Sequence, residues 1–305
     1  MRPLEGIIIP AITPFDETGA LRLDYLKNNY ELWNKTCVQG YMALGSNGEF
    51  RSLDDDEAFA VLKAASEAAA PDKLFIGGIG RESLAHTLKF LDRVMQAQLK
   101  MDYVSVLTPH YFKGLMTDDA LYAYYTAIAD RSSYPVLLYC APGFANNVCI
   151  SPELLTRLAD HPNIAGIKDT SKDMMNTYMD TAGGRDDFEI FSGSLGTIMT
   201  CMERGGKGGI VSAANYFPNA CGKLCRIWKE EGPEAAKEYH AKVLAASKAT
   251  GAKASVAGVK ACMNLMGYTA GVPRIPVLPC SEELTEEFRE AIGTFHDLIQ
   301  DDLQA

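Results

Sequence analysis

The run Ile164-Ala165-Gly166-Ile167-Lys168 is short, almost entirely apolar and ends on a single charged residue. A run of the same kind, Pro135-Val136-Leu137-Leu138-Tyr139, ends one strand-and-helix unit earlier. Strands with apolar residues on both faces are typical of a parallel sheet that is covered on both sides. The two runs therefore predict neighbouring strands of a parallel sheet.

Eight such runs alternate with longer amphipathic stretches from residue 6 to about residue 230. Their spacing of about 25 to 35 residues is what a strand, a helix and their loops require. Because eight parallel strands can close on themselves, the pattern predicts a (β/α)8 TIM barrel. The predicted strands are residues 7–12, 40–44, 74–78, 103–107, 136–139, 164–168, 188–191 and 209–212.

Helix signals lie between the predicted strands. Asp54, Ser83 and Ser151 are each placed as an N-cap before a helical stretch, and Pro152 suits the first helical position after Ser151. A further helix is expected over residues 172–182.

Strand signals stop after Gly232, and three helices are expected over residues 233–250, 256–266 and 282–301. We therefore expect a catalytic barrel over residues 1–231 and a C-terminal three-helix region over residues 232–305.

Composition excludes several classes of function. A formal net charge of −10 offers no basic stripe for nucleic acid. No apolar run approaches the roughly 20 residues that cross a bilayer, and the start lacks the pattern of a secretory signal. Eight cysteines without a CxxC motif are typical of reduced thiols. We expect a cytoplasmic enzyme that binds neither nucleic acid nor membrane.

Reactive groups of a TIM barrel lie at the carboxyl ends of its strands, where Lys168 and Tyr139 are predicted. Apolar neighbours disfavour the charged form of the Lys168 amine, and an uncharged amine is a nucleophile. A phenol can donate and accept the protons that attack on a carbonyl requires. The alternatives are a lysine that pairs with Asp169 and a tyrosine that only fills the core.

Polar loops follow other predicted strands. Gly45-Ser46-Asn47-Gly48-Glu49 combines glycines with short hydrogen-bonding side chains, which suits the carboxylate of a 2-oxo acid. The alternative is a plain turn, with Glu49 as a solvated or capping carboxylate. Residues 108–112 and 192–196 also carry polar groups after strands.

Other chemistries lack their motifs. The five histidines show no metal-binding spacing, and no dinucleotide or P-loop fingerprint occurs, so we expect no metal and no cofactor. Residues 204–209 precede the eighth strand and so belong to the opposite face from the loops above. Lys260 falls in a helix beyond the barrel, and we weigh it as an outside candidate for the site.

Three motifs at their mutual spacing resemble the dihydrodipicolinate synthase and N-acetylneuraminate lyase superfamily of class I aldolases, over essentially the full chain. They are Gly45-Ser46-Asn47-Gly48-Glu49, Tyr139 before Pro142, and Gly166-Ile167-Lys168-Asp169. The resemblance implies a barrel with C-terminal helices, usually tetrameric, in which Lys168 forms an imine with pyruvate or another 2-oxo acid. It also implies that Tyr139 is the acid/base residue.

The same resemblance implies further site residues. Ser46 would link Tyr139 to Tyr111 of the partner subunit by a hydroxyl relay, and the carbonyl of Ile210 would lie near the lysine. The substrate-binding residues implied are Ser46, Asn47, Gly48, Gly193, Ser194, Ile210 and Phe144.

Phe144 bears on the second substrate. Dihydrodipicolinate synthases have an arginine there that receives a carboxylate, and an aromatic ring cannot form that charge-assisted bond. Acetylneuraminate lyases carry acidic residues after the glycine equivalent to Gly193, where this chain has Ser194. The Ser46-Asn47 loop and Gly193-Ser194 are most similar to the 4-hydroxy-2-oxoglutarate aldolase branch, from which Phe144 departs. An aromatic side chain here favours a less charged aldehyde.

Two classes of function stay open. The first is a Schiff-base aldolase that makes or breaks a carbon–carbon bond without a cofactor, because the protonated imine accepts the electrons. It is expected to be 4-hydroxy-2-oxoglutarate aldolase-like, with dihydrodipicolinate synthase and sugar-acid lyases of the deoxygluconate or N-acetylneuraminate type as alternatives. The second is a barrel that binds a 2-oxo acid without turnover.

Overall fold

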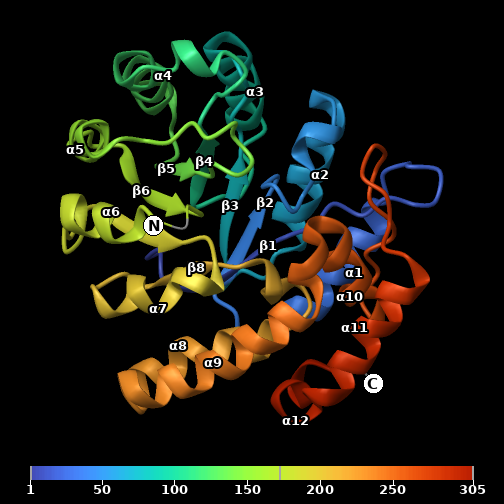
Figure 1. Ribbon diagram of the computed structural model, residues 1–305. Helices are drawn as coiled ribbons and strands as arrows, with labels where there is room; N and C mark the ends of the chain where they lie inside the picture. The colour runs from blue at the N-terminus through green and yellow to red at the C-terminus, as the bar shows by residue number, and fades with distance from the viewer. Residues whose placement is uncertain (1, 172, 304–305) are drawn as a thin grey trace. The chain divides into compact units, whose positions relative to one another are not determined.

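Eight parallel strands form a closed barrel in sequence order (Figure 1). The structure is a computed structural model that describes residues 2–171 and 173–303. All eight predicted strands are present, with ends within two residues of expectation, so the predicted fold class is confirmed. The strands are β1 Gly6–Pro10, β2 Gly40–Ala43, β3 Leu74–Gly78, β4 Tyr103–Leu107, β5 Val136–Cys140, β6 Ile164–Asp169, β7 Glu189–Ser192 and β8 Gly208–Ile210.

Strand register decides which side chains share a face. Tyr139 on β5 is paired with Lys168 on β6, and Cys140 is paired with Asp169. Paired residues of parallel strands point to the same face, and successive residues alternate. Tyr139 and Lys168 therefore share one face of the sheet, while Cys140 and Asp169 share the other.

The chain forms two compact units. The first contains Leu74–Ile210 together with the segment before Gly6. It comprises β3 to β8 and the helices between these strands (Figure 1). These helices are α3 Leu84–Gln96, α4 Asp118–Arg131, α5 Pro152–Ala159, α6 Met175–Ala182 and α7 Leu195–Glu203, with a 3-10 turn at Lys113–Leu115.

The second unit contains Gly6–Lys73 and Val211–Ala305. In this unit α8 and α9 pack side by side (Figure 1). Its helices are α1 Leu23–Trp33, α2 Asp55–Ala68, α8 Pro218–Glu230, α9 Pro233–Ala249, α10 Ser255–Leu265, α11 Glu282–Thr294 and α12 His296–Ile299. Its 3-10 turns are Phe50–Ser52, Ser212–Asn215, Gly251–Ala254 and Gln300–Asp302.

The predicted N-caps are confirmed. Asp54 accepts from the backbone N–H groups of Asp56 and Glu57, Ser83 accepts from that of His86, and Ser151 from that of Leu154. Each cap satisfies a donor that the first helical turn leaves open. The helix expected over 172–182 begins at Met175. Lys172, where that prediction starts, lies outside the described residues.

The helix expected over 282–301 is interrupted, which that prediction missed. α11 ends at Thr294, and Phe295 adopts φ −99° and ψ 17°, outside helical geometry. The chain then turns so that the buried Asp302 accepts from the N–H groups of Asn219 and Ala220 at the start of α8. A straight helix could not place Asp302 there. The division of the chain at residues 231 and 232 stays a prediction.

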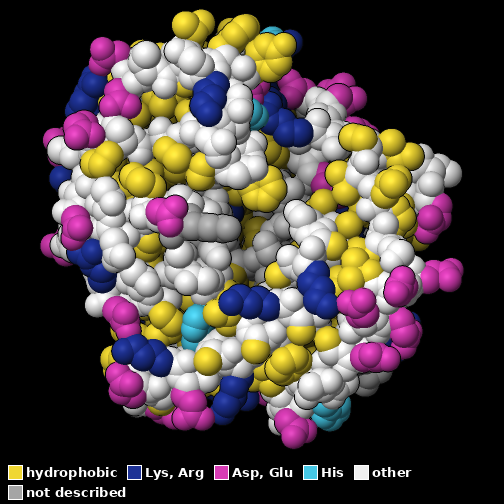
Figure 2. Space-filling model, viewed as in Figure 1, with side chains coloured by type: hydrophobic (Ala, Val, Ile, Leu, Met, Phe, Trp, Pro, Cys, Tyr) yellow, Lys and Arg dark blue, Asp and Glu magenta, His cyan; other side chains and the backbone are white. Residues whose placement is uncertain are grey.

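Charged side chains of both signs are interspersed over the face drawn in Figure 2. Within residues 2–171 and 173–303, no helix combines the length and the apolar character needed to cross a membrane.

Candidate active site

Lys168 and Tyr139 lie together at neighbouring strand ends. Both side chains are buried, each only 3% exposed. The Lys168 Nζ lies 4.1 Å from the centroid of the Tyr139 ring. The β5–β6 register produces this pairing, because it sets the two residues opposite each other. The amine and the phenol that the sequence predicts as neighbours are therefore neighbours, screened from water.

Asp169 follows Lys168 but points to the opposite face of β6. Its fully buried carboxylate accepts hydrogen bonds from the backbone N–H of Ser171 at 2.9 Å and from the Ser171 hydroxyl at 2.8 Å. Burial raises the pKa of Asp169 to about 6, and the Ser171 hydrogen bonds oppose that shift. Ser171 therefore binds the Asp169 carboxylate, which the alternative in the sequence analysis paired with Lys168.

Gly193 follows β7 at the same end of the sheet. Its N–H donates to the carbonyl of Asp169 at 2.6 Å. A Cβ at this position would lie 2.0 Å from Thr170 Cγ2 and 2.9 Å from that carbonyl, so only glycine fits. The close approach ties the end of β7 to the end of β6, directly after Lys168.

Ser194 and Ile210 are two further predicted site residues on this unit. The Ser194 hydroxyl accepts from the N–H of Gly196 and caps α7. Ile210 ends β8, one residue after Gly209, which is paired with Ser192 on β7. The register thus carries Ile210 to the strand ends where Lys168 lies.

Tyr111 and Phe144 differ from these residues because both are exposed, Tyr111 at 75% and Phe144 at 57%. Tyr111 lies in the loop after β4, where the N–H groups of His110 and Tyr111 donate to one carboxylate oxygen of Glu82. Phe144 lies in the turn after β5. Within one chain, neither ring is buried beside the lysine.

The loop after β2 belongs to the second unit. Leu44 and Glu49, at its two ends, adopt positive φ values of 59° and 48°, which residues other than glycine rarely adopt. Between them the N–H of Gly48 donates to the carbonyl of Gly45 and that of Glu49 to Ser46. Strained backbone of this kind concentrates at functional sites.

Side chains fix the same loop from outside. The Thr13 hydroxyl donates to the carbonyl of Gly48 at 2.7 Å, and the Asn47 amide donates to the Ser212 hydroxyl at 2.7 Å. A Cβ on Gly48 would lie 3.2 Å from the carbonyl of Ala11, so this glycine allows close packing. The loop is therefore a tightly held turn.

Glu49 is a buried ion-pair residue, so the alternative of a solvated or capping carboxylate is wrong. Its side chain is 4% exposed, and Oε1 lies 2.5 Å from Lys260 Nζ. Oε2 accepts from the backbone N–H of Arg274 at 2.9 Å. The loop turns Glu49 away from water because the left-handed backbone at this residue directs its side chain toward α10.

Lys260 is the other half of this pair, and sequence reasoning missed its partner. Its side chain is 1% exposed, and Nζ also donates to the carbonyl of Val272 at 2.8 Å and lies 4.5 Å from the Phe15 ring. Burial lowers the pKa of Lys260 to about 8, opposed by the charge of Glu49. The sequence feature that could have indicated a buried ion pair is that Lys260 is the single charged residue in the helix Ser255–Leu265.

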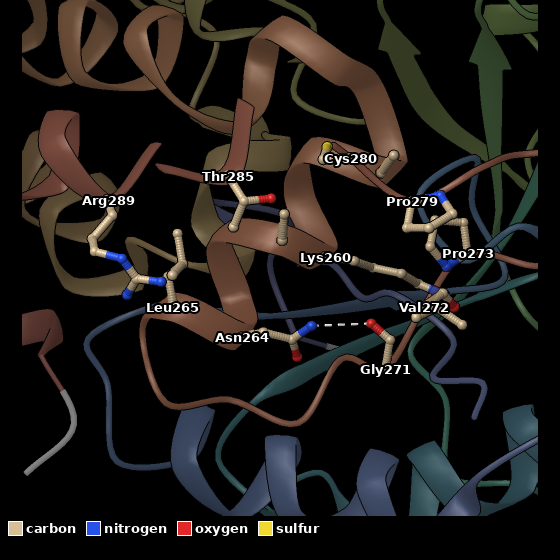
Figure 3. A pocket seen from close by; sticks show the side chains of 12 residues that line it. Lys260, Asn264, Leu265, Gly271, Val272, Pro273, Pro279, Cys280, Thr285 and Arg289 are labelled. Atoms are coloured by element: carbon tan, nitrogen blue, oxygen red, sulfur yellow. Dashed lines mark hydrogen bonds between the residues drawn. The ribbon is translucent and has the colours of Figure 1, made fainter. Parts of the chain in front are cut away.

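A cavity of about 400 Å³ lies beside α10 and is lined in part by Lys260, Asn264 and Arg289 (Figure 3). Figure 3 shows the Lys260 side chain extending toward Val272 and Pro273. Its aliphatic stem lines the cavity, whereas its ammonium is bound by Glu49 and by the carbonyl of Val272. Lys260 therefore offers this cavity no reactive amine.

Comparison with known proteins identifies the family of this chain. The model of the dihydrodipicolinate synthetase family matches residues 3–294. A 4-hydroxy-tetrahydrodipicolinate synthase of Xanthomonas axonopodis pv. citri is 33% identical over 278 residues, which cover 91% of this chain and 90% of the relative. A DapA-like lyase of Thermococcus kodakarensis is 29% identical, with 94% of this chain and 98% of the relative covered.

A solved structure gives the same result. The chloride-inhibited dihydrodipicolinate synthase of Acinetobacter baumannii, crystallised with pyruvate, superimposes with a TM-score of 0.88 at 27% identity, over 96% of this chain and 99% of that one. The superfamily inferred from the three motifs is thus confirmed, and so is the class of enzyme. The chain belongs to the dihydrodipicolinate synthetase family and is a carbon–carbon lyase.

Proposed function

We propose that the protein is a class I aldolase in which Lys168 forms a Schiff base with a 2-oxo acid of the pyruvate type. The observation that carries the proposal is the buried Lys168 amine 4.1 Å from the centroid of the Tyr139 ring. An amine nucleophile and a proton-transferring phenol on adjacent strand ends are what imine chemistry requires. The pyruvate found in the Acinetobacter baumannii structure supports the class of ligand.

The first step joins the lysine to the substrate. The neutral Lys168 amine attacks the C2 carbonyl, the carbonyl oxygen takes up a proton, and the amine loses one, which gives a carbinolamine. Tyr139 transfers both protons, because its hydroxyl can donate and accept. The C2 hydroxyl then takes up a proton from Tyr139 and leaves as water, which gives a protonated imine and leaves Tyr139 as a phenolate that can accept the next proton.

The second step breaks or makes the carbon–carbon bond. In the cleavage direction the 4-hydroxyl loses its proton to Tyr139, the C3–C4 bond breaks and its electron pair moves to the imine, which becomes an enamine. An aldehyde leaves, C3 regains a proton, and water releases pyruvate from Lys168. Condensation is the same sequence in reverse, and neither direction needs a cofactor.

The remaining predicted residues serve substrate binding in this proposal. Ser46, Asn47 and Gly48 would hold the carboxylate of the 2-oxo acid. Because the N–H of Gly48 bonds within the turn, Ser46 and Asn47 supply the donors. Gly193 and Ile210 form the strand-end backbone on the lysine's own unit.

For the second substrate we propose a 4-hydroxy-2-oxoglutarate-like 2-oxo acid. The Ser46-Asn47 loop and Gly193-Ser194 support this branch. The exposed Phe144 departs from it, because a ring cannot bind a second carboxylate as an arginine does. The 4-hydroxy-tetrahydrodipicolinate synthases among the relatives favour condensation with aspartate semialdehyde equally. Pyruvate release from 4-hydroxy-2-oxoglutarate, a deoxygluconate-type acid and N-acetylneuraminate, beside condensation with aspartate semialdehyde, distinguishes these substrates.

Tyr111 supports a shared site in a homotetramer. Its ring is 75% exposed in the single chain, so it is available to a second copy. In this proposal Tyr111 of the partner subunit continues the proton relay from Ser46. Full activity in a diluted monomer would contradict the sharing.

The Schiff base is tested by trapping. Wild-type protein is incubated with pyruvate and sodium borohydride, digested, and mapped by mass spectrometry. We expect one reduced pyruvate adduct, on the peptide that contains Lys168, and none on the peptide that contains the buried Lys260. Binding of pyruvate without any adduct or turnover would favour the non-catalytic barrel instead.

A further inference from the structure

Two cysteines lie against each other directly behind the proposed acid/base residue. Cys140 follows Tyr139 on β5 and is fully buried, while Cys149 follows the turn at residues 142–147 and is partly exposed. The Tyr178 hydroxyl joins the two segments that carry them, and each thiol shifts the pKa of the other. Because Cys140 faces the opposite side of the strand from Tyr139, the pair is separate from the proposed site and adjacent to it.

Tyr178 on α6 links the two segments that carry the cysteines. Its hydroxyl lies 3.3 Å from Cys140 Sγ and donates to the carbonyl of Ile150, the residue after Cys149, at 2.7 Å. One buried hydroxyl thus links the end of β5, which carries Cys140, to the segment that carries Cys149.

The two thiols are unequal. The hydrogen bond from Cys140 lowers the pKa of Cys149, whereas burial and the buried Asp169 charge oppose that shift. The same hydrogen bond, together with burial, raises the pKa of Cys140. The groups that face the pair are Asp169 on β6 and the Tyr178 hydroxyl on α6. Cys149 is therefore the thiol that ionises first and that solvent reaches.

We propose that Cys140 and Cys149 are a redox modification site, at which a peroxide converts the dithiol to an intramolecular disulfide. All eight cysteines lie in the described part of the chain and none forms a disulfide in this structure, which is the reduced state. An exposed thiol with a resolving thiol beside it is the arrangement of redox-sensitive cysteines.

The chemistry balances with hydrogen peroxide as the oxidant. The Cys149 thiolate attacks one peroxide oxygen, the O–O bond breaks, and the hydroxide that leaves takes up a proton to become water. The Cys140 thiol then loses its proton and attacks the Cys149 sulfur of the sulfenic acid, and a second water leaves. Two thiols are oxidised, and one peroxide is reduced to two waters.

The disulfide would alter the neighbouring site through the strand. It draws the two sulfurs from hydrogen-bond contact to about 2 Å, which moves the end of β5 or the turn after it. Tyr139 lies on that strand end and Phe144 in that turn. Since a displacement of about 1 Å can lower a catalytic rate about 100-fold, we expect turnover to fall at least about ten-fold. This effect rests on the proposed function, whereas formation of the disulfide does not.

Peptide mapping tests the modification directly. Both cysteines fall on one tryptic peptide, residues 132–157, which contains no internal lysine or arginine. After treatment with hydrogen peroxide we expect this peptide to lose two hydrogens and to resist alkylation. Further cleavage after Phe144 should leave two fragments joined until dithiothreitol separates them. Separate alkylation of the two cysteines after peroxide would overturn the proposal.

Two variants complete the test. Cys149→Ser should keep its activity in peroxide and form no linked fragments, whereas the control Cys280→Ser, which removes another partly exposed thiol, should respond as wild type does. Reduction of the oxidised wild type should restore turnover. A mapped disulfide with unchanged turnover would overturn the link to the site. If the reduced protein turns over no 2-oxo acid, the proposed function fails while the thiol result stands.

Discussion

Lys168 and Lys260 are two buried lysines with opposite settings, one in each compact unit. Lys168 ends a barrel strand, and its Nζ lies over the ring of Tyr139 at 4.1 Å. Lys260 lies within α10, and its Nζ lies over the ring of Phe15 at 4.5 Å. Burial is nearly the same, at 3% and 1% residue exposure.

The difference lies in what each amine contacts. Lys260 contacts a carboxylate and a carbonyl, which occupy its protons. The ring beside it belongs to a phenylalanine, which transfers no proton, and Arg274 lies over the same ring at 4.2 Å. Lys168 has a phenol as its aromatic neighbour and a place at the end of the barrel where substrates bind. A buried lysine therefore indicates a nucleophile only when its neighbours can move protons.

The sharpest way to break this comparison is Lys168→Ala. We expect turnover to fall by about 10⁴-fold or more, because the covalent intermediate can no longer form. The variant should still unfold cooperatively, measured by circular dichroism. Appreciable aldolase activity in this variant would remove Lys168 from the mechanism.

Tyr139→Phe makes the surroundings of Lys168 resemble those of Lys260, with a ring but no hydroxyl. We expect turnover to fall by about 10²- to 10⁴-fold, which is the usual contribution of a positioned acid/base group. Steady-state kinetics on pyruvate release would measure it. Tyr103→Phe is the matched control on β4, since its hydroxyl donates to the carbonyl of Arg2 instead. Equal turnover rates in the two variants would exclude Tyr139 as the acid/base residue.

Lys260→Met should act on stability instead of chemistry. Removing one partner of a buried ion pair leaves Glu49 uncompensated, and we expect unfolding to become easier by about 3 to 5 kcal/mol. Urea unfolding followed by fluorescence would show this. The variant should still form the borohydride adduct at Lys168, and the double variant Lys260→Met with Glu49→Gln should recover part of the stability. An unchanged urea midpoint would mean that the pair stabilises nothing.

The pH dependence of the free energy of unfolding also tests the role of Lys260. Burial lowers the pKa of Lys260 from its ordinary 10.5 to about 8, so between these pH values the unfolded chain binds more protons than the folded one. The free energy of unfolding should therefore gain a contribution on the order of 3 kcal/mol as pH rises from about 8 to about 10.5, and lose it as pH falls through this range. Urea unfolding across this range should show the rise in wild type and not in Lys260→Met. The same pH dependence in wild type and in Lys260→Met would contradict this assignment to Lys260.

The barrel and the central pair of the site follow from local patterns. Strand runs such as Val136–Cys140 and Ile164–Asp169 are apolar throughout, so their period and spacing predict parallel strands without knowledge of distant contacts. Since a barrel gathers strand ends at one rim, the last residues of two neighbouring runs, Tyr139 and Lys168, must be close. Short-range information was sufficient for these features.

Contacts between segments far apart in the chain could not be predicted in this way. Glu49 meets Lys260 because a loop after β2 and a helix near the C-terminus pack in one unit, and no local period encodes that partner. Asp302 likewise finds the start of α8 only after the chain turns at Phe295. Cys140 and Cys149 are near in sequence, yet the link between their segments is Tyr178 on α6, which bonds to Cys140 and to the carbonyl of Ile150. Patterns of a few residues encode period and strand ends, whereas these partners are set by how the folded elements pack.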